Sequence, residues 1–378
     1  MIQIPVEPKI TDFLHRKASA MRIPLSGTFE LTPVCNMDCR MCYVRMSRQQ
    51  QEAIRPLRTA QEWLSLAEEA KNNGMLYLLL TGGEPFLHPE FRQILTGLHQ
   101  MGFVISINSN GTLIDEKTVE WLKTVAPCRI NITLYGASDE TYGVLCRNPH
   151  GFTQVTRAIR LLKEAGISVK LNCSVTPHNV HDLEGIFAYA REEQLVIQAT
   201  TYMFPPLRKD PSQVGKNDRF TPEQAAYYSA VVEYLQNGEE LFLNRPEEEL
   251  PPLPSDMDEN CDGVGDIVRC RAGKCSFWIT WDGKLMPCGM LPCDAGVNVF
   301  EDGFMPSWRH AVETTDCIRL PAKCAGCSIR QTCRACAAMV MTETGTFDRV
   351  PEYRCQMAYA FRAQRDKLRS EILASHEK

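Results

Sequence analysis

The eight residues CNMDCRMC, from Cys35 to Cys42, hold three thiols in the spacing C-x3-C-x2-C. A strand-like segment ends just before them, at about Thr32. A structural zinc site is closed by four ligands. A [4Fe–4S] cluster has four irons that each need an external ligand, so three thiolates leave one iron open to another molecule. The stretch therefore predicts an iron–sulfur site; zinc held with a distant fourth ligand is the alternative.

The sequence around this stretch alternates between short apolar runs and amphipathic segments. The six candidate strands span residues 28–32, 75–80, 103–108, 129–134, 168–174 and 195–203. Helical periodicity fills the gaps, for example from the N-cap candidate Thr59 to Gly74 and again up to Gly166. Six successive β/α units predict an α/β fold, an open partial (β/α)6 TIM-like barrel, because a closed barrel of this kind needs eight units. The thiols lie in the first β/α loop, at the sheet end where active sites form.

The composition divides the chain into four parts. These are an N-terminal extension (1–27), the barrel (28–208), a connecting helix and linker (209–260), and a small cysteine-rich domain with a C-terminal helix (261–378). Eleven of the 17 cysteines fall in the last part, and clustered thiols in a reducing compartment indicate metal ligation rather than disulfides. The chain shows no signal peptide and no membrane-length apolar run. With a net charge of -5, we expect a cytoplasmic protein with neither nucleic acid nor a membrane as partner.

The three-thiol loop, followed directly by the aromatic Tyr43, resembles that of the radical S-adenosylmethionine (SAM) enzymes. The resemblance implies that Cys35, Cys39 and Cys42 bind a [4Fe–4S] cluster whose open iron chelates the amino and carboxylate groups of SAM. It also implies reductive cleavage of SAM to a 5′-deoxyadenosyl radical, which abstracts hydrogen from a substrate. Such chemistry requires a cofactor, since side chains cannot perform it.

Further motifs stand at the ends of the later candidate strands, in TGGEP, NSNGT and NITLYG, and in the segment LCRNPHGF. Each alone is an ordinary turn or surface residue; together they fit the same family. The resemblance implies SAM-binding roles for Tyr43, Gly82, Gly83, Glu84, Asn110, Thr133 and Arg147. Glu84 would accept a bond from the methionine ammonium, and Arg147 would lie near the carboxylate.

The C-terminal cysteines have regular spacings of their own, including C-x2-C-x5-C-x2-C from Cys324 to Cys336. They resemble the SPASM extension of radical SAM enzymes, which binds two auxiliary clusters. The resemblance implies a first [4Fe–4S] cluster on Cys270, Cys275, Cys288 and Cys336, and a second on Cys324, Cys327, Cys333 and Cys355. A zinc ribbon is the alternative. The cofactors implied are thus SAM and three [4Fe–4S] clusters. The other six cysteines match no ligand position.

SPASM proteins mostly modify peptides or protein side chains. The resemblance therefore implies an oxidoreductase that oxidatively modifies a peptide, by a crosslink or similar maturation step, with the auxiliary clusters accepting the electron. One alternative is a radical SAM dehydrogenase or transferase acting on a small molecule. Another is oxidation of Cys or Ser as in sulfatase maturases, which carry an Asp directly after the cysteine that corresponds to Cys288. Gly289 stands there instead, and disfavours that reaction.

The implied partners are a peptide or protein substrate and an electron donor such as flavodoxin or ferredoxin. Only about 27 residues precede the first strand, so we expect leader recognition to require a separate protein or the two domains themselves. No general base stands out. Asp262, Asp266 and Asp282 are candidates only by their proximity to the cysteines.

Overall fold

The computed structural model describes residues 9–205, 218–244, 265, 267–291 and 297–376. Its centre is one curved sheet with the strand order β6-β5-β4-β3-β2-β1-β7-β8. All neighbouring strands are parallel except β7 and β8. The strands are β1 (Ser26–Glu30), β2 (Tyr77–Thr81), β3 (Val104–Ser109), β4 (Arg129–Thr133), β5 (Val169–Ser174), β6 (Val196–Thr200), β7 (Ser276–Ile279) and β8 (Leu285–Met286).

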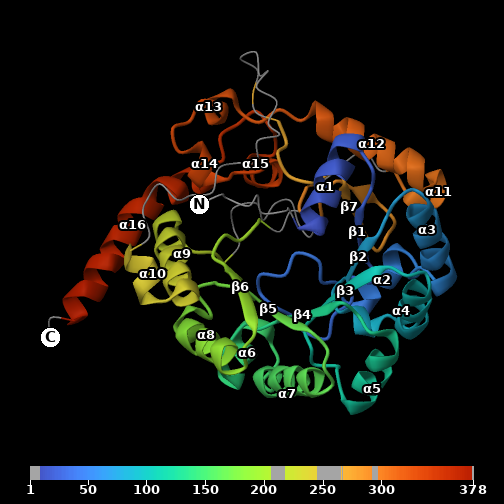
Figure 1. The fold of residues 1–378 in the computed structure, drawn as a ribbon, viewed down its shortest axis with the longest axis horizontal. Helices are drawn as coiled ribbons and strands as arrows, with labels where there is room; N and C mark the ends of the chain where they lie inside the picture. The colour runs from blue at the N-terminus through green and yellow to red at the C-terminus, as the bar shows by residue number, and fades with distance from the viewer. Residues whose placement is uncertain (1–8, 206–217, 245–264, 266, 292–296, 377–378) are drawn as a thin grey trace, which may run out of the picture.

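Helices cover the outer side of this sheet, and Figure 1 shows the strands as an open arc inside them. Between β1 and β6 the helices are α2 (Arg48–Ile54), α3 (Ala60–Asn72), η1 (Pro85–Leu87), α4 (Phe91–Gln100), α5 (Glu116–Val125), α6 (Asp139–Cys146), α7 (Gly151–Glu164), η2 (Val180–Asp182) and α8 (Leu183–Glu192). The predicted open partial barrel is confirmed.

Local sequence signals explain where these helices begin and end. Thr59 caps α3 and forms a capping box with Glu62, as the N-cap prediction requires. Gly74 and Gly166 follow α3 and α7 with positive φ angles of 107° and 73°, which glycine adopts at little cost. The inward faces of the helices meet the apolar side of the sheet, where Trp63 of α3 packs 5.1 Å from Phe29 of β1, between ring centroids.

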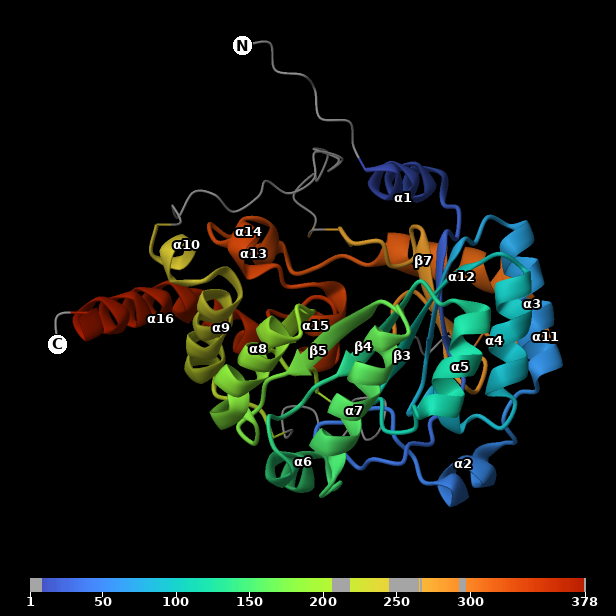
Figure 2. The same ribbon diagram turned by 60° about the horizontal axis from the view of Figure 1, so that its bottom comes forward.

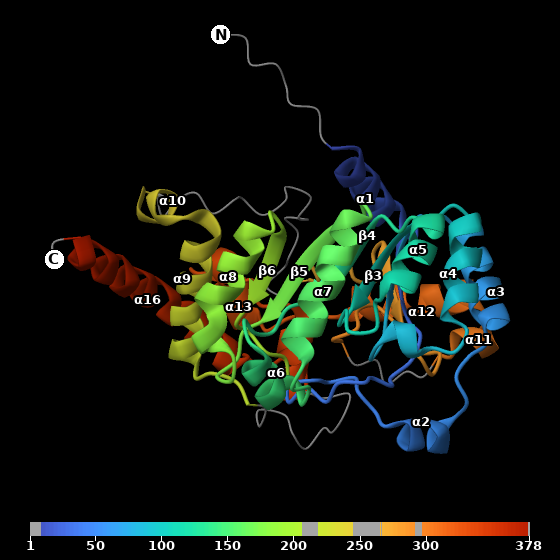
Figure 3. The ribbon, with the colours of Figure 1, turned by 90° about the horizontal axis from the view of Figure 1, so that it is seen from below.

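The remaining elements lie outside the six β/α units. Helix α1 (Ile10–Met21) precedes β1. The elements after β6 are α9 (Pro222–Asn237), α10 (Glu239–Asn244), α11 (Val299–Asp302), α12 (Phe304–Cys317), α13 (Ala322–Ala325), α14 (Arg330–Cys333), α15 (Ala337–Thr344) and α16 (Glu352–His376). Helix α16 runs along α9 in three views (Figures 1, 2 and 3). Helices α13 to α15 lie across the open side of the arc in Figure 1.

The cysteine-rich segment is joined to the barrel through the sheet itself. Strand β7 pairs in parallel with β1, with Ser276 opposite Ser26 and Ile279 opposite Phe29. The edge strand β1 is therefore covered by a partner about 250 residues further along the chain. The domain boundary at residue 261 remains a prediction. The central sheet contains strands from both sides of this boundary. Among the described residues, no helix has the length and apolar character needed to cross a membrane.

Candidate active site

The three-thiol loop follows β1, and its own backbone donates hydrogen bonds to two of its sulfurs. The Met37 N–H donates to Cys35 Sγ at 3.4 Å, and the Arg45 N–H donates to Cys42 Sγ at 3.3 Å. The Cys42 N–H donates to the carbonyl of Cys39, which closes a turn. Hydrogen bonds from backbone N–H groups to cysteine sulfur are one of the means by which proteins tune iron–sulfur clusters.

The loop is also held against the end of α6. The Asp38 N–H donates to the carbonyl of Cys146 at 3.1 Å, and the Asp38 carboxylate lies 3.4 Å from Arg147 Nε and 3.2 Å from an Arg45 nitrogen. Arg147 ends α6 with a φ of 54°. The structure thus brings Arg147 next to the thiol loop, although its predicted contact with SAM stays a prediction.

Gly82 and Gly83 follow β2 and let the backbone before the thiol loop approach closely. A Cβ on Gly82 would lie 2.4 Å from the Thr32 carbonyl oxygen, and one on Gly83 would lie 2.5 Å from that of Val34. The Gly83 N–H donates to the Thr32 carbonyl at 2.7 Å. We attribute the need for glycine to this contact within the chain. Cofactor binding by the same backbone stays a prediction.

Glu84 is completely buried and ties the end of β2 to the end of β3. Its carboxylate accepts from the Asn110 N–H at 2.7 Å, the Ser109 hydroxyl at 2.9 Å and the Phe86 N–H at 3.3 Å. Burial raises the pKa of Glu84 to about 7, against the lowering effect of these donors. The carboxylate thus holds Asn110 in position. It is also the candidate acceptor for the methionine ammonium.

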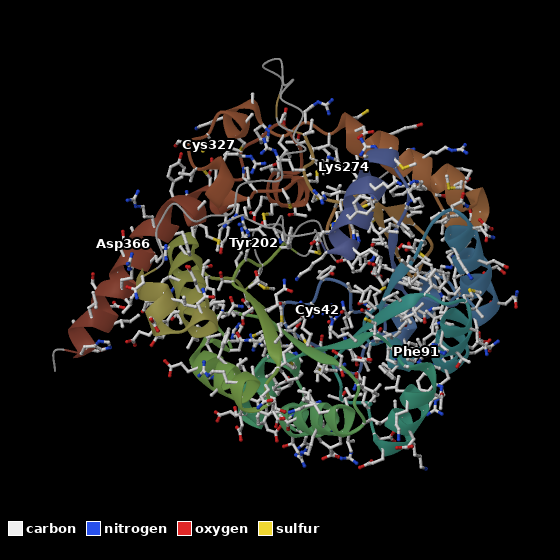
Figure 4. The ribbon with its side chains drawn as sticks, viewed as in Figure 1. Cys42, Phe91, Tyr202, Lys274, Cys327 and Asp366 are labelled. Carbon is white, nitrogen blue, oxygen red and sulfur yellow. The ribbon has the colours of Figure 1, made fainter. Side chains whose placement is uncertain are left out.

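Asn110 in turn connects β3 to the thiol loop. Its side-chain amide donates to Asn36 Oδ1 at 2.9 Å and lies 3.6 Å from Cys35 Sγ. Thr133 is the last residue of β4, and Tyr43, directly after Cys42, is half-buried. The sequence-predicted residues therefore converge on one end of the sheet, and Figure 4 shows Cys42 near the centre of the arc. Their roles as ligands remain predictions.

The donor set of the loop fits an iron–sulfur cluster. Burial raises the pKa of the Cys35 thiol to about 12, and Glu84, Cys39 and Cys42 add to the increase. A metal reverses this, because a coordinating thiol is deprotonated outright. Within the described ranges, no three His, Cys, Asp or Glu side chains are placed to share a single ion. Cluster ligands have no such requirement, since each thiolate binds its own iron.

The C-terminal thiols lie in two neighbourhoods. In the first, burial raises the pKa of Cys288, and the nearby Cys270 and Cys336 add to it. The pKa of Cys275 is raised by burial and also by Cys270. In the second, burial raises the pKa of the Cys324 thiol, and its neighbours Cys333, Cys355 and Cys327 add to it. Each neighbourhood holds the four cysteines that the sequence resemblance assigns to one auxiliary cluster; the assignment itself stays a prediction.

The remaining cysteines are scattered. Cys128 and Cys317 are exposed, whereas Cys146 and Cys173 are buried. Cys146 makes a thiol hydrogen bond with Cys39 that is the main cause of a raised Cys39 pKa. Sequence spacing gave no sign of this contact. The described residues do not include the base candidates Asp262 and Asp266 or the thiols Cys261 and Cys293. Asp282 sits in the turn between β7 and β8, where its carboxylate accepts from the Thr280 hydroxyl.

Gly289 lies against a tryptophan on the inner face of the sheet. A Cβ on Gly289 would come within 2.6 to 2.8 Å of three ring carbons of Trp278, in β7. The Trp278 indole N–H donates to a carboxylate oxygen of Glu30, at the end of β1, at 3.0 Å. Glu30 is completely buried. The indole therefore occupies the place into which a side chain at position 289 would point.

An open β/α barrel with a three-thiol loop after its first strand defines the class of radical enzymes that use an iron–sulfur cluster. Residues 29–190 match the model of the Radical SAM superfamily, so this part of the chain is a Radical SAM domain. This confirms the resemblance drawn from the three-thiol loop. The cysteine-rich C-terminal region fits the SPASM type.

Relatives extend the similarity beyond that domain. The chain is 25% identical over 335 residues to an AdoMet-dependent heme synthase of Methanosarcina barkeri, covering 84% of this chain and 93% of that protein. It is 26% identical to the subtilosin biosynthesis protein AlbA of Bacillus subtilis, covering 75% of this chain and 59% of AlbA. Among solved structures, Streptococcus suis SuiB bound to its precursor peptide SuiA superposes with a TM-score of 0.67 at 17% identity, over 94% of this chain and 84% of SuiB.

Proposed function

We propose that the protein is a radical SAM enzyme that oxidatively modifies a peptide or protein side chain. The observation that carries the proposal is the joining of Cys35 to Asn110, and of Asn110 to Glu84, at one end of a barrel of this superfamily. Similarity to AlbA, and the precursor peptide bound to SuiB, support a peptide as the substrate class.

Individual residues have distinct tasks in this proposal. Cys35, Cys39 and Cys42 would hold the first cluster, and the loop backbone donates hydrogen bonds to the sulfurs of Cys35 and Cys42. The glycine pair, Glu84, Asn110, Thr133, Arg147 and Tyr43 would hold SAM. The two C-terminal groups of four thiols would hold two auxiliary clusters. Together the bound groups supply one-electron chemistry that side chains lack.

Oxidation of the sulfatase-maturase type is disfavoured by the packing at Gly289. An Asp at this position would have to displace the Trp278 indole, which is held by Glu30. Overpacking of this kind costs about 1–3 kcal/mol. The packing of Trp278 against Gly289 therefore supports the sequence-based prediction that this reaction is disfavoured.

A second candidate is radical modification of a small molecule. It is favoured by one comparison, since the chain covers 93% of the heme synthase but only 59% of AlbA. A short precursor peptide encoded beside the gene would favour the first candidate. Modification of that peptide by the reconstituted enzyme, measured as a mass change, would decide for it.

The first experiment counts iron after anaerobic reconstitution, beside a Cys35/Cys39/Cys42→Ala variant. Three [4Fe–4S] clusters predict about 12 irons, decreasing to about 8 in the variant. The same samples are assayed for 5′-deoxyadenosine released from SAM under reductant, which the variant should not produce. Absence of iron and of cleavage in the unmodified protein would refute the proposal.

A further inference from the structure

The inner face of the sheet carries two cations on neighbouring strands. Ile130 and Ile132 of β4 are completely buried in the core that also contains Ala158 of the outer helix α7. Side chains alternate along a strand, so Arg129 and Asn131 of β4 take the opposite, inner face. On β5 the same argument places Lys170 on the inner face, because Leu171 is completely buried.

Strand register places these side chains next to one another. Lys170 lies directly opposite Asn131, and Asn131 lies opposite Asn108 on β3. Arg129 is two residues before Asn131 and therefore one step along the same face. The pKa of Lys170 is lowered by burial and by the charge of Arg129. The two cations thus interact electrostatically across adjacent strands.

Among the described residues, neither cation forms an ion pair with a carboxylate. Lys170 donates to Gln198 of β6, which uses one of its three donors. Arg129 is exposed and has five donors with no acceptor described. Two like charges side by side are unfavourable without a counter-charge. An anionic ligand would remove this repulsion.

Asn131, opposite Lys170 on the same face, has an acceptor that lacks a donor. Its side chain is nine-tenths buried, and its amide nitrogen donates to Asn108 Oδ1 at 2.8 Å. Its own Oδ1 atom has no partner in the part of the chain that the structure describes. A buried acceptor without a donor costs free energy. Lys170 is the donor on the paired strand. A ligand that holds its ammonium in place would let Lys170 donate both to the ligand and to Asn131 Oδ1.

We propose that Arg129 and Lys170, backed by Asn131, form a subsite for a carboxylate group of the substrate on the inner face of the barrel. The proposal rests on the proposed function, because it assigns an acidic substrate to the same enzyme. Arg129 and Lys170 stand at the first and second residues of their strands, whereas the thiol loop lies at the opposite strand ends. The subsite would therefore hold a part of the substrate remote from the reacting atoms.

The carboxylate has two possible sources, an acidic residue of a peptide or a small organic acid. The test measures calorimetric binding of two probes to the anaerobically reconstituted full chain, namely acetyl-Ala-Glu-Ala-amide and glutarate. The Gln version of the peptide is the uncharged control probe. We expect saturable binding of the Glu peptide, of glutarate or of both. Binding of the peptide alone indicates a peptide acid, and binding of glutarate shows that a free acid suffices.

Matched variants locate the subsite. Lys170→Gln and Arg129→Gln should each weaken binding by about tenfold, as expected for loss of one charge-assisted hydrogen bond. Arg160→Gln, which changes an exposed cation on the outer helix α7, should leave the affinity unchanged. Equal affinity of wild type and both inner-face variants, or no saturable binding of either probe, would overturn the proposal.

Two further measurements keep the result interpretable. If a variant does not fold, acetylation of Lys170 in the wild type is followed by mass spectrometry, and protection by the bound probe is expected. No protection would count against the subsite. SAM cleavage is measured in the same samples without a probe. In the wild type, absent probe binding with intact cleavage refutes only the subsite, and absent cleavage with intact binding refutes only the proposed function.

Discussion

A buried ion pair between Arg219 and Glu343 offers the sharpest stability test. The guanidinium donates to both carboxylate oxygens, at 2.5 and 2.9 Å, and the Tyr202 hydroxyl donates to the same carboxylate at 2.6 Å. The two charged side chains are only 8% and 6% exposed. Arg219 also lies 3.5 Å from the ring centre of Tyr353. The pair therefore links the end of β6, the segment before α9, and helices α15 and α16.

Replacing Glu343 by Gln keeps the shape of the side chain and removes its charge. Breaking a buried pair by removing one partner costs about 3–5 kcal/mol, because the remaining charge is left uncompensated. For a chain of 378 residues the entropy of unfolding is about 0.8 kcal/mol/K. We therefore expect Glu343→Gln to lower the unfolding midpoint by about 4–6 °C, measured by calorimetry on the anaerobic protein.

Two variants calibrate this value. Glu120→Gln removes the partner of Lys123, an exposed pair on α5, and should shift the midpoint by less than about 1 °C. Tyr202→Phe removes one hydrogen bond to the charged carboxylate and keeps the ion pair, so its shift should be about 2–4 °C. The reasoning is wrong if Glu343→Gln shifts the midpoint no more than Glu120→Gln does.

Three further predictions concern the active site. Burial raises the pKa of Glu84 from its ordinary 4.5 to about 7, so the stability that its protonated form contributes is present below about pH 4.5 and lost as the pH rises through about 7. Glu84→Gln in the cofactor-free protein should flatten the dependence of the midpoint on pH in this window, and an unchanged slope would contradict the assignment. Gly289→Asp should lower the midpoint by about 1–4 °C through its clash with Trp278, and it should cost less in a Trp278→Ala background than in the wild type; additive effects would show that the two sites do not interact. Cys146→Ala should retain the full iron content while Cys39→Ala loses about four irons, and equal losses would make Cys146 a ligand candidate.

Much of the barrel could be predicted because its signals are local. The apolar run before Thr81 forms β2, and the capping box at Thr59 begins α3 as expected. Strand ends were less accurate. The last candidate strand was extended to residue 203, but β6 ends at Thr200, and Tyr202 leaves the sheet to meet Glu343. That contact joins residues 141 positions apart, and no local pattern encodes it.

The same limit applies to the site. Thiol spacing and the GGE motif are contiguous, so the sequence alone marked Cys35 and Glu84 as candidate site residues. The pairing of β7 with β1 and the hydrogen bond of Trp278 to Glu30 depend on segments about 250 residues apart. Ser19 of α1 likewise donates to Cys275 Sγ at 3.1 Å, which links the N-terminal extension to a candidate cluster ligand. Such contacts are visible only once the chain is folded.

Gly289 shows how these two kinds of information combine. The sequence indicates only that an expected carboxylate is missing after Cys288. The structure gives the physical reason, because the Trp278 indole fills the space and is fixed by a buried Glu30. Restoring the carboxylate alone would therefore not restore a proton acceptor, since the indole would first have to move. As packed here, position 289 therefore offers no proton acceptor, and we propose that a reaction that loses a proton in this enzyme delivers it to a different group.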